Sequence, residues 1–182
     1  MLIRLGTALG DAGRKVAIIV NEIGEVGVDG AVIESNGMKS VELTEGCICC
    51  TLSGSLQNTL RQISREYAPD VIMIEPTGLA LPNRIERIVR ISMIGEDRTF
   101  TISLVDAYRA VKLFDEAGAF VTRQIEGADV VVVNKVDIVA KEVKDHVENI
   151  VKSISPSTPL VFTSARDGKG INELISLLEG AL

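Results

Sequence analysis

Residues 130–137 read VVVVNKVD, a run of valines followed by polar residues. The four valines are typical of a strand that is buried on both faces of a parallel sheet. Asn134, Lys135 and Asp137 follow at its carboxyl end, where open α/β sheets bind ligands. An Asp carboxylate can accept two hydrogen bonds from guanine, a Lys stem can lie across the base, and Asn can fasten the loop. The alternative interpretation is a solvated polar loop after a strand.

Strands and helices alternate on both sides of this stretch. Short apolar runs predict strands at residues 16–20, 40–43, 71–74, 99–105, 130–133 and 160–163. Amphipathic spacing predicts helices at residues 2–9, 53–66, 111–125, 141–154 and 171–178, and a further helix containing residues 85–89 that Asn83 can cap. This order favours an α/β fold of three layers, with a mostly parallel sheet flanked by helices. We expect one domain over residues 1–182, because no repeat or linker interrupts it.

The composition narrows the class of protein. The chain is 46% hydrophobic but only 3% aromatic, so its core is built from aliphatic residues. The net charge is -6 without a basic stripe, which argues against a nucleic-acid partner. The longest aliphatic run is far too short to span a membrane, and the first residues lack a signal-peptide layout. Three clustered cysteines in such a chain favour reduced thiols and a cytoplasmic location.

All three cysteines lie in one run, GCICC, at residues 46–50. Thiolates are soft ligands that favour Zn²⁺, Cu⁺ and similar ions, so Cys47, Cys49 and Cys50 are candidate metal ligands. Three ligands leave one tetrahedral position empty, which suits exchange or catalysis better than a closed structural site. The alternative is a cluster of inert, buried thiols.

Two further segments place chemistry at strand ends. Glu75 ends the strand of residues 71–74, and such an acid can hold Mg²⁺ while the N–H of Gly78 can approach a γ-phosphate. Ser164 and Ala165 follow the strand of residues 160–163, where backbone N–H groups can contact a guanine oxygen. Each of these segments alone also fits a solvated loop.

Residues 21–30 read NEIGEVGVDG and form a glycine-rich acidic segment. Glu22, Glu25 and Asp29 can bind cations and change position with the state of a nucleotide. A solvated acidic loop is the simpler interpretation of this segment by itself.

The order NExGEVGVDG, GCICC, EPTGLALP, VDA, ADVVVVNKVD and SA closely resembles the GTPase domain of the CobW-like metallochaperones. These belong to the class of P-loop GTPases that includes the hydrogenase and urease nickel chaperones. The resemblance implies GTP and Mg²⁺ as cofactors, with Zn²⁺ or Co²⁺ as the leading cargo ions and Ni²⁺ as a third candidate. It implies a client metalloenzyme or cobalamin-pathway protein as partner, and a homodimer is a candidate assembly.

The resemblance also implies a role for each candidate residue. Guanine would be selected by Asn134, Lys135 and Asp137. Ser164 and Ala165 would help in this recognition. The metal would be held by the three cysteines, and Glu75 would serve Mg²⁺ and position water. Glu22, Glu25 and Asp29 would lie in the switch region that links metal to nucleotide.

The chain departs from the family pattern in three ways. It contains no phosphate loop of the form GxxGxGK[ST], and the nearest cluster, Gly168-Lys169-Gly170, has the wrong place and spacing. We therefore expect the sequence to begin just after that loop, to lack a central strand and to leave strand edges unpaired. GTP binding would then be weak or absent. Tyr108 and Arg109 stand where relatives often place a metal-binding His, and His146 is expected to be solvated. Many relatives carry a further C-terminal domain, and we expect residues 1–182 to comprise the GTPase core alone.

The favoured interpretation is a GTP-dependent metal chaperone domain, in which GTP binding and hydrolysis change metal affinity at the cysteine cluster. Two alternatives stay open. In the first alternative, the chain is a non-catalytic metal-binding fragment that has lost its nucleotide site. In the second, it is a GTPase whose cysteines are only structural.

Overall fold

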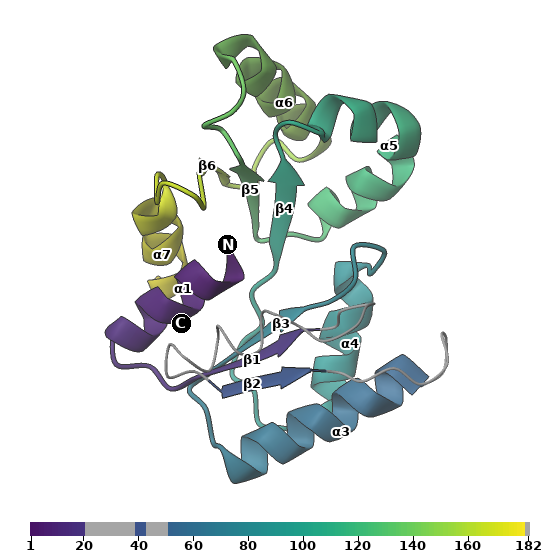
Figure 1. Ribbon diagram of the computed structural model, residues 1–182. Helices are drawn as coiled ribbons and strands as arrows, with labels where there is room; N and C mark the ends of the chain where they lie inside the picture. The colour runs from purple at the N-terminus through teal and green to yellow at the C-terminus, as the bar shows by residue number, and fades with distance from the viewer. Residues whose placement is uncertain (21–38, 43–50, 181–182) are drawn as a thin grey trace. The chain divides into compact units, whose positions relative to one another are not determined.

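The computed structural model describes residues 1–20, 39–42 and 51–180 (Figure 1). The chain divides into two compact units, Met1–Asp97 and Arg98–Leu182. The first unit contains α1 (Leu2–Asp11), β1 (Val16–Val20), β2 (Lys39–Glu42), α3 (Thr51–Glu66), β3 (Val71–Glu75) and α4 (Pro82–Ser92). The second contains β4 (Ile102–Asp106), α5 (Ala110–Glu126), β5 (Val130–Asn134), α6 (Lys141–Ile154), β6 (Leu160–Phe162) and α7 (Ile171–Glu179).

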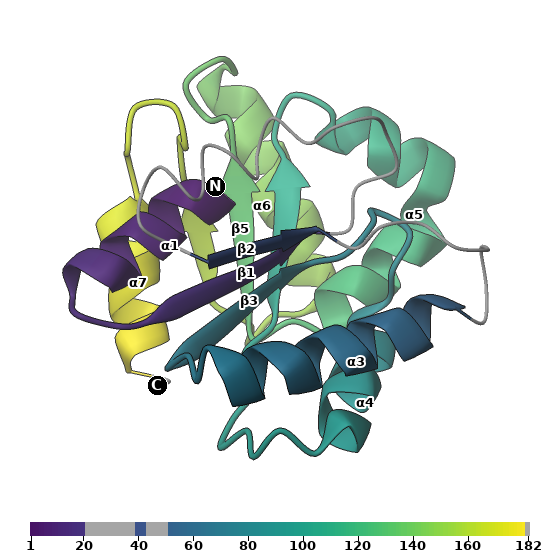
Figure 2. The same cartoon turned by 60° about the horizontal axis from the view of Figure 1, so that its bottom comes forward.

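Each unit is built on a three-stranded parallel sheet. The strand order is β2-β1-β3 in the first unit and β4-β5-β6 in the second, and every described pairing is parallel. Figure 2 shows β2, β1 and β3 side by side. The predicted α/β class, with parallel sheets flanked by helices, is confirmed, although the described strands form two sheets.

The first sheet is covered on both faces. Ala17 and Ile19 of β1 pack against apolar residues of α3 and α4. The intervening residues Val16, Ile18 and Val20 pack on the other face with Leu9 of α1. Alternate side chains of a strand point to opposite faces, so the unbroken apolar run of β1 reflects burial on both sides.

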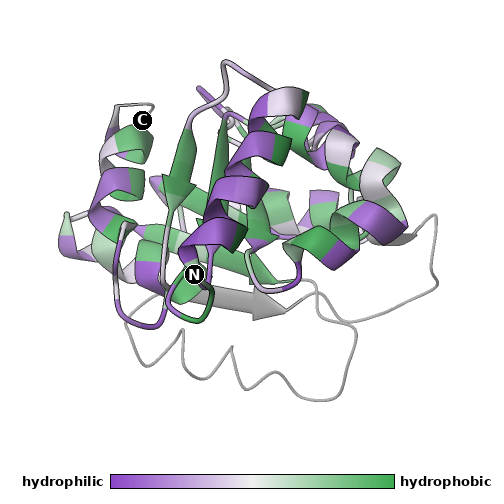
Figure 3. Cartoon of the chain, turned by 90° about the horizontal axis from the view of Figure 1, so that it is seen from above, coloured by the Kyte–Doolittle hydropathy of each residue, from purple (hydrophilic) through white to green (hydrophobic). Residues whose placement is uncertain are grey.

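The second unit has its central strand in β5. Val131 and Val133 pack in one core with Val121 of α5 and Val147 of α6. Val130 and Val132, whose side chains alternate with these, are also completely buried. The helices of both units carry their apolar residues in stripes, which Figure 3 shows as alternating green and purple segments.

Most predicted elements are confirmed within a few residues. The strands at residues 16–20 and 130–133 and the helix at residues 141–154 match the structure at both ends or to one residue. The strand predicted from residue 99 begins only at Ile102. The reason lies in the preceding residue: the Thr101 N–H donates to the Asp129 carboxylate at 2.7 Å, and pairing with β5 starts at Ile102 beside Val130.

The prediction that Asn83 caps α4 is wrong. Leu81 has an extended backbone and occupies the cap position, no side chain makes a cap hydrogen bond, and Pro82 is the first helical residue. Proline suits this position because its fixed φ is already helical and its missing N–H would have had no partner there. Asn83 therefore lies inside the first turn.

β3 and β4 follow one another among the strands of the chain, and each lies at the edge of its own sheet among the described strands. The sequence predicts unpaired strand edges because it predicts that a central strand is missing. The absence of that strand stays a prediction. Among the described residues, no helix is long and apolar enough to cross a membrane.

Candidate functional site

The carboxyl ends of β4, β5 and β6 bring polar residues together at one edge of the second sheet. The register pairs Asp106 of β4 with Asn134 of β5, and Val133 with Phe162 of β6. Thr163, which follows Phe162, is therefore next to the end of β5. In open parallel sheets this edge is where ligands bind.

Asn134 joins the ends of all three strands. Its Oδ1 accepts a hydrogen bond from the Ala165 N–H at 2.9 Å and from the Thr163 hydroxyl at 3.2 Å. Its backbone carbonyl accepts from the Ala107 N–H at 2.9 Å. Asn134 thus fastens the turn after β6 and the residue after β4 to the end of β5, while any contact with a base stays a prediction.

The turn after β6 is closed by its own hydrogen bonds. Ser164 is buried, its hydroxyl lies 3.3 Å from a carboxylate oxygen of Asp167, and it accepts the Asp167 N–H at 3.2 Å. The Ser164 N–H donates to the Lys169 carbonyl at 3.0 Å. The Ala165 N–H already donates to Asn134, so a guanine oxygen at this place would share that donor.

This turn also requires a glycine. Gly170 has φ +73°, and a Cβ added there would lie 2.1 Å from the carbonyl oxygen of Phe162. The Gly-Lys-Gly cluster at residues 168–170 is thus explained by the turn between β6 and α7.

Lys135 directs its side chain back to β4. Its Nζ lies 2.8 Å from Oδ2 of Asp106, and the other carboxylate oxygen of Asp106 accepts the Tyr108 N–H at 3.0 Å. Burial by itself would raise the pKa of Asp106, but the hydrogen bonds from Lys135 and the Tyr108 N–H together with the Lys135 charge hold it below its ordinary value. Sequence reasoning assigned no role to Asp106. The signal available was an acidic residue that ends the strand preceding β5.

Asp137 is exposed, and its carboxylate makes no hydrogen bond or ion pair with the rest of the described chain. The backbone around it is fixed: the Val136 N–H donates to the Thr163 carbonyl at 3.2 Å, and the Ile138 N–H donates to the Lys135 carbonyl at 3.3 Å. Within the part of the chain that the structure describes, this segment therefore presents an unpartnered carboxylate from a short turn whose backbone is hydrogen-bonded.

Glu75 and Gly78 belong to the first unit. Glu75 is exposed at the carboxyl end of β3, in register with Val20 at the end of β1. Gly78 is also exposed, in the turn where the Ala80 N–H donates to the Thr77 carbonyl at 2.9 Å. These two residues and the group around Asn134 thus occupy different compact units.

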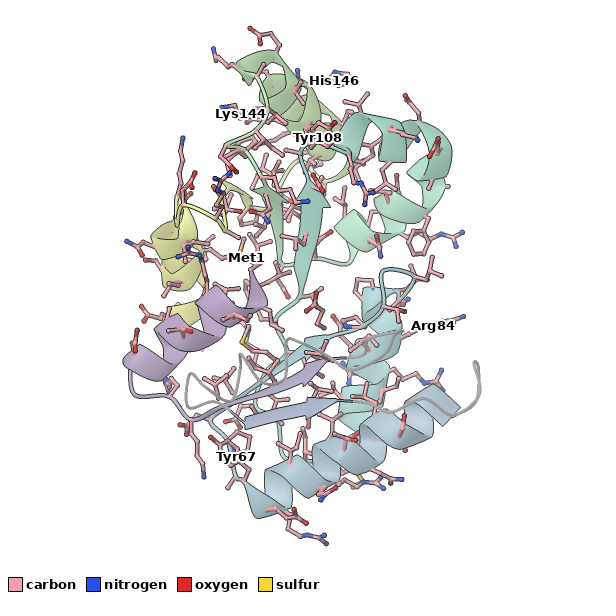
Figure 4. The ribbon with its side chains drawn as sticks, viewed as in Figure 1. Met1, Tyr67, Arg84, Tyr108, Lys144 and His146 are labelled. Carbon is pink, nitrogen blue, oxygen red and sulfur yellow. The ribbon has the colours of Figure 1, made fainter. Side chains whose placement is uncertain are left out.

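The predicted metal ligands lie outside the described residues. This holds for the cysteines and for the acidic segment, that is, for Cys47, Cys49, Cys50, Glu22, Glu25 and Asp29. Within the described ranges, no group of three or more His, Cys, Asp or Glu side chains is placed to hold a metal ion. His146 is exposed on α6, as expected, and Figure 4 labels it together with Tyr108, which precedes α5.

Comparison with known proteins gives the chain its relatives. Zinc chaperone YeiR from Escherichia coli K12 is 33% identical over 129 residues, covering 70% of this chain and 39% of that protein. The zinc-regulated GTPase metalloprotein activator 1 of Dictyostelium discoideum is 23% identical over 188 residues, covering 82% of this chain and 40% of that protein. The chain thus spans less than half the length of these relatives.

Two solved structures share the fold. Hydrogenase maturation factor HypB from Archaeoglobus fulgidus superposes with a TM-score of 0.73 at 19% identity, covering 99% of this chain and 81% of that one. HypB from Helicobacter pylori, solved in complex with nickel, gives 0.69 at 16% identity, with 98% and 80% covered. The profile of the family described as CobW/HypB/UreG, nucleotide-binding domain, matches residues 2–162. This match extends over more than half of the sequence, and the chain therefore belongs to the CobW/HypB/UreG family.

Proposed function

We propose that this chain is the nucleotide-binding domain of a GTP-dependent metal chaperone. The observation that carries the proposal is the edge formed by β4, β5 and β6. There the carboxylate of Asp137, which has no partner among the described residues, lies two residues from the tethered Lys135. The family to which the chain belongs supports nucleotide binding. Relatives named zinc chaperone and zinc-regulated GTPase metalloprotein activator support a role in metal handling.

Guanine recognition follows from hydrogen-bond chemistry. The ionised Asp137 carboxylate is an acceptor only, and guanine offers two donors on one side, N1–H and the exocyclic amine. The Lys135 stem would lie against the base plane. Asn134 keeps the turn with Ser164 and Ala165 at the same edge, where the Ala165 N–H would be shared with the base oxygen.

Hydrolysis would use the first unit. Glu75 would hold Mg²⁺ directly or through water, and the Gly78 N–H would approach the γ-phosphate. Water would attack the γ-phosphorus in line as the bond to the β-phosphate oxygen breaks, which releases GDP and phosphate. Residues 1–182 contain no GxxGxGK[ST] sequence, so we expect this chain by itself to bind GTP weakly.

The metal part of the proposal rests on Cys47, Cys49 and Cys50, with the acidic residues between β1 and β2 as the switch. Thiolates suit Zn²⁺, Co²⁺ and Ni²⁺, and neutral or acidic oxygen ligands alone would not distinguish these ions from harder ones. A nucleotide-dependent coupling of about 1–3 kcal/mol would change metal affinity roughly 5–150-fold, which is enough for delivery to a client metalloenzyme.

An Asp137→Asn substitution tests the nucleotide site. The amide of the variant can donate a hydrogen bond to the C2 oxygen of xanthine, but it can no longer accept hydrogen bonds from both guanine donors. The ratio of the affinity for GDP to the affinity for xanthosine diphosphate should therefore fall about 10-fold or more. NMR chemical-shift titration measures this ratio even at millimolar affinity. Asp115→Asn, at an exposed position of α5, is the matched control. An unchanged ratio in the Asp137 variant would place guanine recognition elsewhere.

Zinc titration with and without GTP tests the coupling and separates the alternatives. The proposal predicts a different Zn²⁺ affinity in the two states and loss of binding when the three cysteines are changed to serine. A chain that binds Zn²⁺ equally in both states and binds no guanine nucleotide is a metal-binding fragment. If the chain binds guanine nucleotide and its Zn²⁺ affinity is unchanged by the Cys→Ser substitutions, its cysteines are only structural.

A further inference from the structure

We propose that Asp106 is a positioning residue that holds the Lys135 side chain in place for the base and keeps it away from Asp137. This inference rests on the proposed guanine site and adds a residue to it. Asp106 ends β4, a different strand from the one that carries Lys135 and Asp137.

The Asp106 carboxylate is fixed by contacts on both oxygens. Oδ2 accepts from the Lys135 ammonium at 2.8 Å, and Oδ1 accepts from the Tyr108 N–H at 3.0 Å. The strand register adds a third constraint, because Asp106 pairs with Asn134, the neighbour of Lys135. The carboxylate is therefore a fixed anchor for the end of a long, flexible side chain.

Lys135 is held at both of its ends. Its backbone has φ +65°, a left-handed conformation that a non-glycine residue adopts only where the surroundings impose it. Hydrogen bonds of the next residues impose it here: the Val136 N–H donates to Thr163, and the Ile138 N–H donates to the Lys135 carbonyl. With its backbone and ammonium group both tied, the aliphatic stem between them is ordered before a base arrives, and this ordering lowers the entropic cost of binding.

The pair also accounts for the lack of a partner for Asp137 among the described residues. Lys135 is the nearest cation in sequence to Asp137, and a mobile lysine two residues away would compete with the base for that carboxylate. In the structure the Lys135 ammonium pairs with Asp106, and Asp137 has no partner among the described residues. Asp106 stays ionised because its pKa is depressed, so the pair persists across the neutral range.

A double-mutant cycle between Asp106 and Lys135 tests the inference by GDP titration followed by NMR. Asp106→Asn should weaken GDP binding about 5–10-fold, because the Lys135 stem regains its rotamer freedom and its charge reaches Asp137. In a Lys135→Met background, where an apolar stem remains without charge, the same substitution should change GDP affinity less than about 2-fold. Asp115→Asn should leave it unchanged.

A second readout needs no nucleotide. The ¹³C shift of the Asp106 carboxyl, followed with pH, should give a higher pKa in Lys135→Met than in the unsubstituted chain. An unchanged pKa, or an equal loss of GDP affinity in both backgrounds, overturns the positioning role. If Asp137→Asn fails to alter the choice between GDP and xanthosine diphosphate, or if no variant binds GDP, the proposed guanine site is wrong and this inference falls with it. A normal Asp137→Asn result with no coupling between Asp106 and Lys135 removes the inference alone.

Discussion

The two parallel sheets differ at their carboxyl edges. In the second unit the strand ends are tied to one another: Lys135 reaches Asp106, and Asn134 accepts from Thr163 and Ala165. In the first unit β1 and β2 lead directly into residues 21–38 and 43–50, so the described part of that edge is limited to residues such as Glu75 and Gly78.

The central strands themselves are alike. β1 and β5 are both buried on two faces, by aliphatic side chains of alternating direction. The carboxyl edge of the second sheet carries a set of hydrogen-bonded polar groups around Asn134, whereas the residues that follow β1 and β2 lie outside the described residues. The hydrogen bonds around Asn134 fix the second edge, and the described contacts that stabilise the first sheet are its apolar contacts with α1, α3 and α4.

Leu60→Ala should have the largest effect and tests the dependence of the first unit on packing. Leu60 of α3 is completely buried against the sheet, so its truncation should lower the free energy of unfolding by about 2–5 kcal/mol. Urea denaturation measures the loss. Leu79→Ala removes an equal volume from a side chain that is 81% exposed and should cost less than about 0.5 kcal/mol. Equal costs at the two positions would show that packing of α3 does not stabilise this unit.

Gly170→Ala and Gly95→Ala compare a glycine of each unit. Both have positive φ, but only Gly170 is crowded, with Phe162 O at 2.1 Å from an added Cβ, whereas nothing lies within 4 Å at Gly95. We expect losses of about 3 kcal/mol at Gly170 and about 1 kcal/mol at Gly95 in thermal unfolding. Similar losses would mean that the turn after β6 relaxes and that its tight closure is not needed.

Asn134→Ala removes the side chain that links the end of β5 to the turn after β6. It leaves the Ala165 N–H and the Thr163 hydroxyl without their acceptor, which should cost about 1–3 kcal/mol. Amide hydrogen exchange should accelerate at Ala165 before it accelerates in the β5 core. Asn149→Ala, on the exposed surface of α6, is the control. Unchanged exchange at Ala165 would contradict the role of Asn134 in fastening the turn.

Asp106→Asn should have the smallest effect on stability, no more than about 1 kcal/mol at pH 7, because the Lys135 side chain is 53% exposed. The pKa of Asp106 is lower in the folded chain than its ordinary value of 3.8, so the ion pair stabilises the fold above that pH. This contribution is lost as the pH falls through the depressed folded value. Urea denaturation of both chains between pH 7 and pH 2 should therefore converge in acid. A constant difference across that range would exclude ionisation of Asp106 as its source.

Much of the fold could be predicted because its signals are local. The valine run of β5 and the amphipathic spacing of α6 depend only on neighbouring residues, and both elements appear where the sequence predicts them. The predicted start of β4 and the predicted cap of α4 were wrong. Both depend on contacts and backbone geometry that residue type alone does not reveal, such as the hydrogen bond between Thr101 and Asp129.

The sequence is enough to predict most of the strands and helices, and to predict that Asn134, Lys135 and Asp137 follow a buried strand. What these residues contact depends on how distant segments pack together. Asp106 lies 29 positions from Lys135, and Asn134 lies 31 positions from Ala165, so both contacts depend on strand register. Register is set by the packing of the valines of β5 against α5 and α6, and this long-range interaction brings the acid of one strand to the lysine of the next.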